Sequence, residues 1–202
     1  EWACPDEQEV NEPVILYSGA FAEQDELENL IQAFGLLKKK GLQFRVVMLG
    51  GNKREPNRVQ ETAAQIEQLG LTDVVEMKGF VPLEQVRKQL CQSNILINIR
   101  RDGIWSRSGL STKLSEYLAS GRMVISSEVG EVEYYLKDGK SALLVSGQTT
   151  AKEIAQALER GLASLELRQK IGAAGRQVAL KNFDVNVVKE TLLVMLSRVV
   201  PN

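Results

Sequence analysis

The stretch that decides the fold is VILYSGAFAEQDELENLIQAFGLLKKKGLQFRVVMLGG, residues 14–51. It begins and ends with short runs of β-branched and apolar residues, VILYSG at 14–19 and FRVVMLGG at 44–51. Between these runs, apolar residues recur every three or four positions until Gly41, a residue type that commonly ends helices. The stretch therefore predicts a strand, a helix and a second strand.

The same alternation continues along the chain. Four more runs of strand length are VVEMKGF (74–80), NILINIR (94–100), MVISSEVG (123–130) and SALLVSG (141–147), and NRVQETAAQIEQLG predicts a helix that stops at Gly70. Because the runs are continuously apolar, they are typical of a parallel sheet that helices cover on both faces. We therefore predict a Rossmann-like, doubly wound parallel sheet of about six strands with helices on both faces.

Three additional helical segments follow the last predicted strand, at 151–163, 166–180 and about 184–199. Thr150, with Glu153 three residues later, has the pattern of a capping box for the first of them. Since no linker, low-complexity tract or internal repeat interrupts the sequence, we expect residues 1–202 to form one domain. The chain does not begin with methionine, and we expect it to be a fragment of a longer protein.

Composition and charge exclude several classes of function. The chain has 25 Lys and Arg against 26 Asp and Glu, so its net charge of −1 gives no bulk attraction for nucleic acid or anionic lipid. Its first residues, EWACPDEQEV, do not have the pattern of a signal peptide, and no apolar run approaches the roughly 20 residues that a membrane-spanning helix needs. We expect a cytoplasmic protein, peripheral to the inner face of the cell membrane only if another part of the full-length protein provides the association.

The reactive residue types are few. The chain has no histidine, which removes histidine bases, Ser-His-Asp triads and most zinc sites. Its two cysteines, Cys4 and Cys91, lie far apart without motif spacing, so we predict reduced thiols. There is no Asp-x-Asp pair, and no bound metal is expected.

The connection RRDGIWSRSGLS, 100–111, is the longest one predicted after any strand. It follows the carboxyl end of a strand, where open parallel sheets bind ligands, and long loops in compact domains are usually functional or disordered. It carries three arginines and Trp105. The alternative to a binding loop is that the arginines are solvated and Trp105 covers a hydrophobic edge.

The segment GLSTKLSEYLASG, 109–121, predicts a helix that begins after Ser111 as its N-cap. Unpaired backbone N–H groups at such a helix start bind anions; here they belong to Thr112, Lys113 and Leu114. Lys113 adds a positive charge at the same end, which favours a phosphate or diphosphate.

Glu116 lies three residues beyond Lys113 and shares its face of the helix. A carboxylate can accept hydrogen bonds from two adjacent hydroxyls, such as those of a ribose, so phosphate and diol together indicate a nucleotide. The alternative is an ordinary surface pair of Lys113 and Glu116 without a ligand. Gly50 and Gly51 would also let a phosphate approach the backbone, although a strand-to-helix turn needs glycine in any case.

In the order VILYSGAF, NLIQAF, RVVMLGG, VVEMKGFVP, NILINIR and STKLSEYLASGRMVISSEVGEVEYYLKDGKSALLV, the sequence resembles the C-terminal, nucleotide-sugar-binding domain of family four retaining glycosyltransferases of the GT-B fold. Asn98 to Arg100 and Ser111 to Gly121 are similar to the bacterial surface-polysaccharide branch. The resemblance implies transfer of a sugar, as by a hexosyltransferase, from a UDP-, GDP- or ADP-sugar to a glycan, lipid or other acceptor. It further implies retention of configuration, no metal, and an N-terminal acceptor-binding domain without which this domain is inactive.

The resemblance also implies roles for individual residues. Glu116 matches the glutamate that holds the ribose, the helix start at Thr112 to Leu114 meets the diphosphate, and the turn at Phe80 and Val81 lies against the base. Gly19 matches the glycine that ends the first strand.

Three positions depart from the family pattern. Ser108 stands where many members have a glutamate that contacts the donor sugar, and Ala20 and Asp25 stand where an arginine and a lysine commonly contact the donor phosphates. We therefore expect Arg100 and Lys113 to carry the diphosphate charge together. The departures keep a second hypothesis open, a catalytically inactive nucleotide-binding or scaffolding module. A receiver-like or flavodoxin-like domain is disfavoured because no acidic cluster follows the first strand.

Overall fold

A computed structural model describes residues 2–51 and 56–199 of the chain. Its elements in chain order are β1 (Val14–Gly19), α1 (Leu27–Lys39), β2 (Arg45–Gly50), α2 (Pro56–Gln68), β3 (Val75–Gly79), α3 (Leu83–Gln92), β4 (Ile95–Asn98), α4 (Ile104–Arg107), α5 (Thr112–Ser120), β5 (Met123–Ser127), α6 (Val132–Tyr135), β6 (Leu143–Val145), α7 (Ala151–Ala163), α8 (Leu165–Asn182) and α9 (Val185–Val199). The strands form one parallel sheet in the order β3-β2-β1-β4-β5-β6. This order confirms the predicted Rossmann-like, doubly wound sheet.

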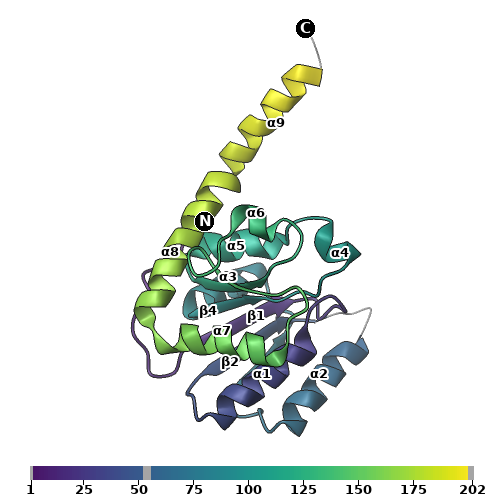
Figure 1. The fold of residues 1–202 in the computed structure, drawn as a ribbon, viewed down its shortest axis with the longest axis vertical. Helices are drawn as coiled ribbons and strands as arrows, with labels where there is room; N and C mark the ends of the chain where they lie inside the picture. The colour runs from purple at the N-terminus through teal and green to yellow at the C-terminus, as the bar shows by residue number, and fades with distance from the viewer. Residues whose placement is uncertain (1, 52–55, 200–202) are drawn as a thin grey trace.

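Helices cover both faces of the sheet (Figure 1). Successive strand residues point to opposite faces, so β1 contributes Ile15 and Tyr17 to one buried core and Leu16 to the other. Helices α1 and α7 pack on the first face, where the core includes Phe34. Helices α3 and α5 lie over the second face, where the core includes Tyr117. The continuously apolar strands of the sequence are thus buried on both sides.

The three C-terminal helices occupy the predicted positions, and α9 leaves the body of the domain (Figure 1). The Thr150 hydroxyl caps α7 by accepting a hydrogen bond from the Glu153 N–H at 3.3 Å, but the Glu153 carboxylate accepts from the Ser146 N–H at 2.7 Å, so only half of the predicted capping box forms. Helix α9 exposes large apolar side chains over much of its surface: Val185, Val188, Leu192, Leu193, Val194, Met195 and Leu196. Among the described residues, no helix combines the length and apolar character needed to cross a membrane.

The prediction of two reduced thiols is wrong in this structure, because Cys4 and Cys91 form a disulfide. Sequence spacing gave no sign of it, since the pairing depends on how the segment before β1 folds back over the second face. The Cys4 N–H donates to the Ser120 carbonyl at the end of α5, at 3.1 Å, and this places Cys4 beside the end of α3. Further along the segment, the Glu7 carboxylate forms a buried ion pair with Arg168 of α8 at 2.5 Å.

The carboxyl ends of β1 and β2 approach each other closely. Gly19 and Gly50 are register partners, and the Gly51 N–H donates to the Gly19 carbonyl at 3.0 Å. Gly50 has φ of 102°, and a Cβ there would lie 2.0 Å from the Gly19 oxygen. The backbone geometry therefore requires glycine at position 50, as expected for a strand-to-helix turn whether or not a phosphate binds there.

We expect Gly50→Ala to lower the free energy of unfolding by about 2–4 kcal/mol, because it combines an unfavourable φ with a steric clash. Gly41→Ala is the matched control, since Gly41 has φ of 76° and a Cβ there would meet nothing within 4 Å. It should lose only the conformational part, about 1–2 kcal/mol. Denaturant titration of both variants measures the difference, and equal losses would contradict the close approach of the two strands.

Candidate functional site

A cavity of about 520 Å³ opens at the carboxyl ends of β1 and β4. These strands are neighbours, but β1 leads to α1 on one face and β4 leads through α4 to α5 on the other, so the chain diverges and leaves a crevice. We call it the switch-point cavity. Its lining comes from the segments after both strands and from the start of α5: Gly19, Ala20, Ala22, Gln24, Asp25, Arg100, Trp105, Ser108, Gly109, Leu110, Ser111, Thr112 and Lys113.

The cavity brings together half of the predicted site residues. Gly19, Arg100, Ser111, Thr112 and Lys113 line it, whereas Leu114, Glu116, Gly50, Phe80 and Val81 do not. Leu114 is fully buried, and its N–H donates to the Ser111 carbonyl at 2.9 Å. The prediction that this amide is free for an anion is therefore wrong, because the first turn of α5 is tightened by this bond.

The remaining start of α5 keeps its anion-binding character. Within the part of the chain that the structure describes, the amides of Thr112 and Lys113 have no hydrogen-bond acceptor. Ser111 is the N-cap, as predicted, but its side chain makes no capping hydrogen bond. Two backbone donors and the positive end of the helix dipole thus face the cavity.

Lys113 extends from this helix start toward the end of β1. Its ammonium nitrogen lies 5.5 Å from the centre of the Tyr17 ring and would be 2.8 Å from a Cβ at Gly19. Burial lowers the Lys113 pKa, and the positive charge of Arg100 lowers it further, while Asp25 and Glu116 raise it. Lys113 and Arg100 therefore share one site, where their mutual repulsion favours a bound anion.

Sequence reasoning missed the role of Asp25, which it treated as a departure from the family's phosphate-contacting lysine. Asp25 does line the cavity but is only 6% exposed. Its carboxylate accepts hydrogen bonds from the Tyr17 hydroxyl at 2.7 Å and the Ala22 N–H at 3.1 Å. Burial, followed by the charge of Asp25, raises the Tyr17 pKa well above its ordinary value. Asp25 thus serves as a nearby counter-charge to Lys113.

The arginines of the 100–111 connection separate into two groups. Arg101 donates to the buried Glu26 carboxylate at 2.6 Å, and Arg107 donates to both oxygens of Asp102, at 2.7 and 2.6 Å. Arg100 lines the cavity and has no carboxylate within 4.0 Å among the described residues. It is therefore the arginine of this connection that an anion in the cavity can engage.

The same connection is more ordered than the predicted loop. It contains the short helix α4, and the buried Ser106 hydroxyl accepts from the Gly103 N–H at 2.8 Å and donates to the Arg101 carbonyl at 2.6 Å. Trp105 is 77% exposed at the cavity rim, so it covers no hydrophobic edge. A rim tryptophan of this kind offers a flat surface to a ligand.

Glu116 lies one helical turn behind the cavity and is half-buried. Burial raises the pKa of its carboxyl, and the positive charges of Arg87 and Lys113 lower it. Phe80 stands near the end of β2, its ring 3.7 Å from the position that a Cβ on Gly51 would occupy. The predicted ribose and base contacts therefore lie beyond the lining of the cavity in this ligand-free state.

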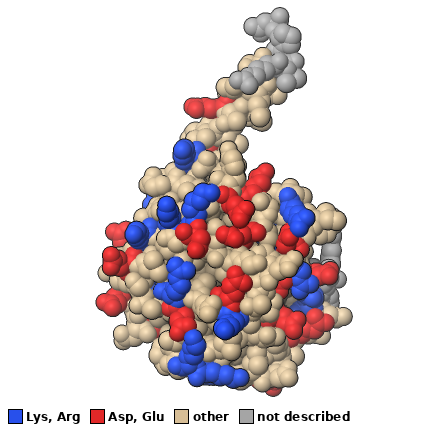
Figure 2. All heavy atoms as spheres, in the orientation of Figure 1, with Lys and Arg blue, Asp and Glu red and all other residues tan. Residues whose placement is uncertain are grey.

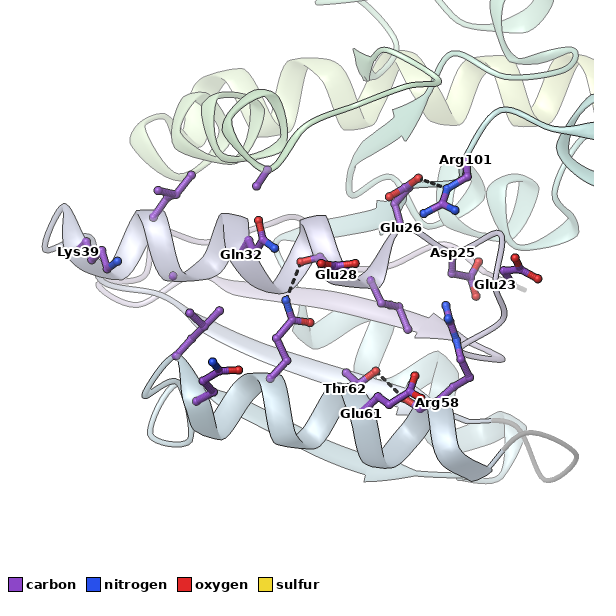
Figure 3. Close-up of a pocket in the computed structure, with 17 residues that line it drawn as sticks. Glu23, Asp25, Glu26, Glu28, Gln32, Lys39, Arg58, Glu61, Thr62 and Arg101 are labelled. Carbon is purple, nitrogen blue, oxygen red and sulfur yellow. Dashed lines mark hydrogen bonds and ion pairs between the residues drawn. The ribbon is translucent and has the colours of Figure 1, made fainter.

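A second hollow of about 780 Å³ runs between α1 and α2 (Figure 3). Its walls carry Glu23, Glu28 and Glu61, and the figure shows Arg101 turned to Glu26 at one end. The acidic lining disfavours a phosphate. Over the face in Figure 2, positive and negative side chains are interspersed without a field of one sign, so attraction for an anion would have to come from local cations such as those of the switch-point cavity.

A doubly wound parallel sheet with cations and a helix start at its switch point belongs to the class of α/β domains that bind ligands at the strand ends. Within this class, the chain is a member of the family described as Glycosyl transferases group 1, which matches residues 5–178. The resemblance inferred from the sequence is confirmed.

Relatives include proteins named as glycosyltransferases, and solved structures share the fold. The chain is 22% identical over 192 residues to alpha-maltose-1-phosphate synthase of Mycolicibacterium smegmatis, covering 91% of the chain and 48% of that protein. It is 25% identical over 178 residues to WcaL of Salmonella typhimurium, a glycosyltransferase assigned to colanic acid biosynthesis, covering 88% of the chain and 43% of that protein. The structure of Anabaena HepE in complex with UDP and glucose superposes with a TM-score of 0.80 at 18% identity, over 93% of the chain and 48% of HepE. The chain therefore spans about half the length of these proteins.

We expect Lys113→Met to raise the free energy of unfolding of the ligand-free chain by about 0.5–2 kcal/mol, because it removes a buried charge that serves binding more than folding. The Lys113 pKa is lowered in the folded state, so the gain should be present at neutral pH and shrink as the pH rises through that lowered value. Lys140→Met, at an exposed lysine, is the control in parallel denaturant titrations. A loss of stability in Lys113→Met would favour a structural ion pair.

Proposed function

We propose that this chain is the donor-binding domain of a glycosyltransferase that moves a sugar from a nucleoside diphosphate sugar to an acceptor, with retention and without a metal. The observation that carries the proposal is the placement of Arg100, Lys113 and the start of α5 around one cavity. Two cations and free backbone amides match the charge and hydrogen-bonding needs of a diphosphate.

These groups also suit the chemistry of a departing diphosphate. Negative charge grows on the leaving group as the bond to the sugar breaks, and fixed cations and helix amides stabilise it electrostatically. In this chain, Arg100 can grip phosphate oxygens in a forked geometry, while Lys113 acts as a point charge beside Gly19. The pair supplies the positive charge that a metal or the missing clamp at Ala20 and Asp25 would otherwise provide.

An acceptor-binding N-terminal domain completes the proposed enzyme. The relatives are about twice as long as this chain, and α9 carries an apolar face that the domain does not cover. Such a face suits packing against a further domain. With colanic acid biosynthesis among the assigned roles of the relatives, we propose bacterial surface polysaccharide as the pathway class. The cytoplasmic location stays a prediction.

The alternative function is an inactive nucleotide-binding or scaffolding module. One observation favours it: Ser108, at the position of the sugar-contacting glutamate, lines the cavity and donates its hydroxyl hydrogen bond to the Trp105 carbonyl. A serine so engaged places no carboxylate beside the donor sugar. Both hypotheses predict nucleotide binding, and they separate on sugar transfer by the full-length protein.

Calorimetry with uridine and UDP tests the binding site. Glu116→Gln should weaken both ligands by about 1–3 kcal/mol, because it removes a charge-assisted acceptor for the ribose. Arg100→Ala and Lys113→Ala should weaken UDP alone and flatten its salt dependence, since both cations face the diphosphate. Arg107→Ala is the matched control from the same connection, because Arg107 is paired with Asp102.

Equal losses for uridine and UDP in the two cation variants would sink this assignment, as would unchanged affinities. GDP and ADP, titrated in parallel, identify the preferred base. A chelator should leave the UDP affinity unchanged if binding is independent of metal.

The chain alone should transfer no sugar to any acceptor, because the proposed reaction takes place between two domains and this chain supplies one. Mass spectrometry of reactions containing UDP-, GDP- or ADP-sugars and simple glycan or lipid acceptors checks this expectation. Detected turnover by the 202-residue chain would show that the donor domain suffices.

A further inference from the structure

The segment at the start of the described chain forms a strap over two helices that flank the candidate nucleotide site. We define the N-terminal strap as residues 2–4. The Cys4–Cys91 disulfide joins it to α3, and the Cys4 N–H donates to Ser120, the last residue of α5, at 3.1 Å. The strap is thereby fixed to both helices at once.

Trp2 of the strap lies over Arg87 of α3. The guanidinium carbon is 4.7 Å from the centre of the tryptophan ring, a distance at which a cation and an aromatic face attract each other. Arg87 and Cys91 are four residues apart in α3 and so lie on the same side of that helix. The disulfide therefore fixes the strap at the point from which Trp2, two residues away, reaches Arg87.

Arg87 in turn influences Glu116 across the contact between α3 and α5. The positive charge of Arg87 lowers the pKa of the Glu116 carboxyl, against the larger effect of burial, which raises it. Lys113 acts in the same direction from within α5, and the neighbouring Tyr117 is buried and keeps its proton. The strap is thus joined to α3, which packs against the helix that carries Glu116, and the charge of Arg87 acts on the carboxylate proposed to hold the ribose.

We propose that the N-terminal strap is a thiol-sensitive positioning element of the nucleotide site, in which Trp2 fixes Arg87 on α3, which packs against the helix that carries Glu116, while the Cys4–Cys91 bond is intact. This inference rests on the proposed function of Glu116. Trp2 is a positioning residue in it, because it acts through Arg87 and touches no ligand.

The switch is a thiol–disulfide exchange. A dithiol reductant supplies two electrons and two protons; the Cys4–Cys91 bond breaks, two thiols form, and the reductant becomes a disulfide. Among the described residues, the strap itself then keeps the backbone bond to Ser120 and the contact of Trp2 with Arg87, while Glu7 still anchors the segment that follows it through Arg168. Such a short segment gains conformational freedom when the covalent link opens, and Trp2 leaves Arg87.

The test measures uridine affinity of the 202-residue chain by calorimetry before and after dithiothreitol, with free thiols titrated in both samples. Reduction should expose two thiols and raise the uridine Kd about two- to fivefold, the range expected for weakening one partly exposed charge–charge interaction, here that of Arg87 with the Glu116 carboxylate. Cys4→Ser should reproduce the reduced state and no longer respond to the reductant. Trp2→Ala should weaken binding in the oxidised chain, while Trp2→Phe should restore most of it.

A second readout reports on Glu116 without any ligand. Carbon-13 NMR titration of its carboxyl should give a higher pKa after reduction, because a displaced Arg87 no longer favours the charged form. As the pH is lowered, uridine affinity should therefore begin to fall at a higher pH in the reduced chain than in the oxidised chain. Tyr134→Ala, which removes an exposed aromatic ring from α6, is the control and should change neither value.

The outcomes separate the two proposals. Equal uridine affinities and an unchanged Glu116 pKa before and after reduction overturn the strap while leaving the proposed function in place. Free thiols in the purified, untreated chain also overturn it. Absence of binding by uridine and UDP in every state overturns the proposed function, and with it the role of the strap in nucleotide binding.

Discussion

The hydroxyl of Tyr117 holds the site together. It accepts a hydrogen bond from the Ser18 N–H at 3.1 Å and donates one to the Ser18 carbonyl at 3.3 Å. These bonds fix α5 to the carboxyl end of β1. Tyr117 is buried, and burial raises its pKa well above the ordinary value, which keeps the hydroxyl protonated and able to donate. Because β1 supplies Gly19 and α5 supplies Lys113, this contact sets the width of the cavity between them.

Around that contact, the positive charges of Lys113 and Arg100 are electrostatically unfavourable when no anion is bound. Lys113 and Arg100 repel each other in the empty cavity, and burial penalises the lysine charge. Asp25 offsets part of this cost, and its own burial is made tolerable by the Tyr17 hydroxyl and the Ala22 N–H. Under the proposed function, this arrangement is preorganised for an anion, since the diphosphate meets cations that already occupy their places.

The fold was readable from the sequence because each signal was local. The apolar runs at 14–19 and 123–130 and the capping pattern at Thr150 depend on residues next to one another, and the structure confirms all three. The lining of the cavity by Arg100 and Lys113 could be predicted for a related reason, because parallel strands place the segments that follow them at one edge.

The missed features depend on contacts between distant segments. Nothing near Cys4 indicates that it meets Cys91, since the pairing follows from the path of the strap over α3 and α5. Likewise, the sequence shows an acid at Asp25 where the family has a cation. It does not show that the buried Tyr17 hydroxyl donates a hydrogen bond to the Asp25 carboxylate. The Leu114 N–H is not free for an anion because it donates to the Ser111 carbonyl. The first turn of a helix can tighten in this way, and the sequence does not specify whether it does.

Helix α9 extends away from the rest of the domain as an arm (Figure 1). It follows α8 after a joint at Phe183 and Asp184, where the Phe183 N–H donates to Ala179 and the Asp184 carboxylate accepts from the Asn186 N–H. Helix α8 is anchored in the core through Arg168, whereas the apolar side chains of α9 are exposed, so a change in the angle between the two helices would be absorbed at the joint. At 1.5 Å per residue, the 15 residues of α9 give an arm of about 22 Å, and a rotation of about 10° at the joint moves its tip by about 4 Å. Anything carried on that arm changes its distance from the cavity without any change in the sheet.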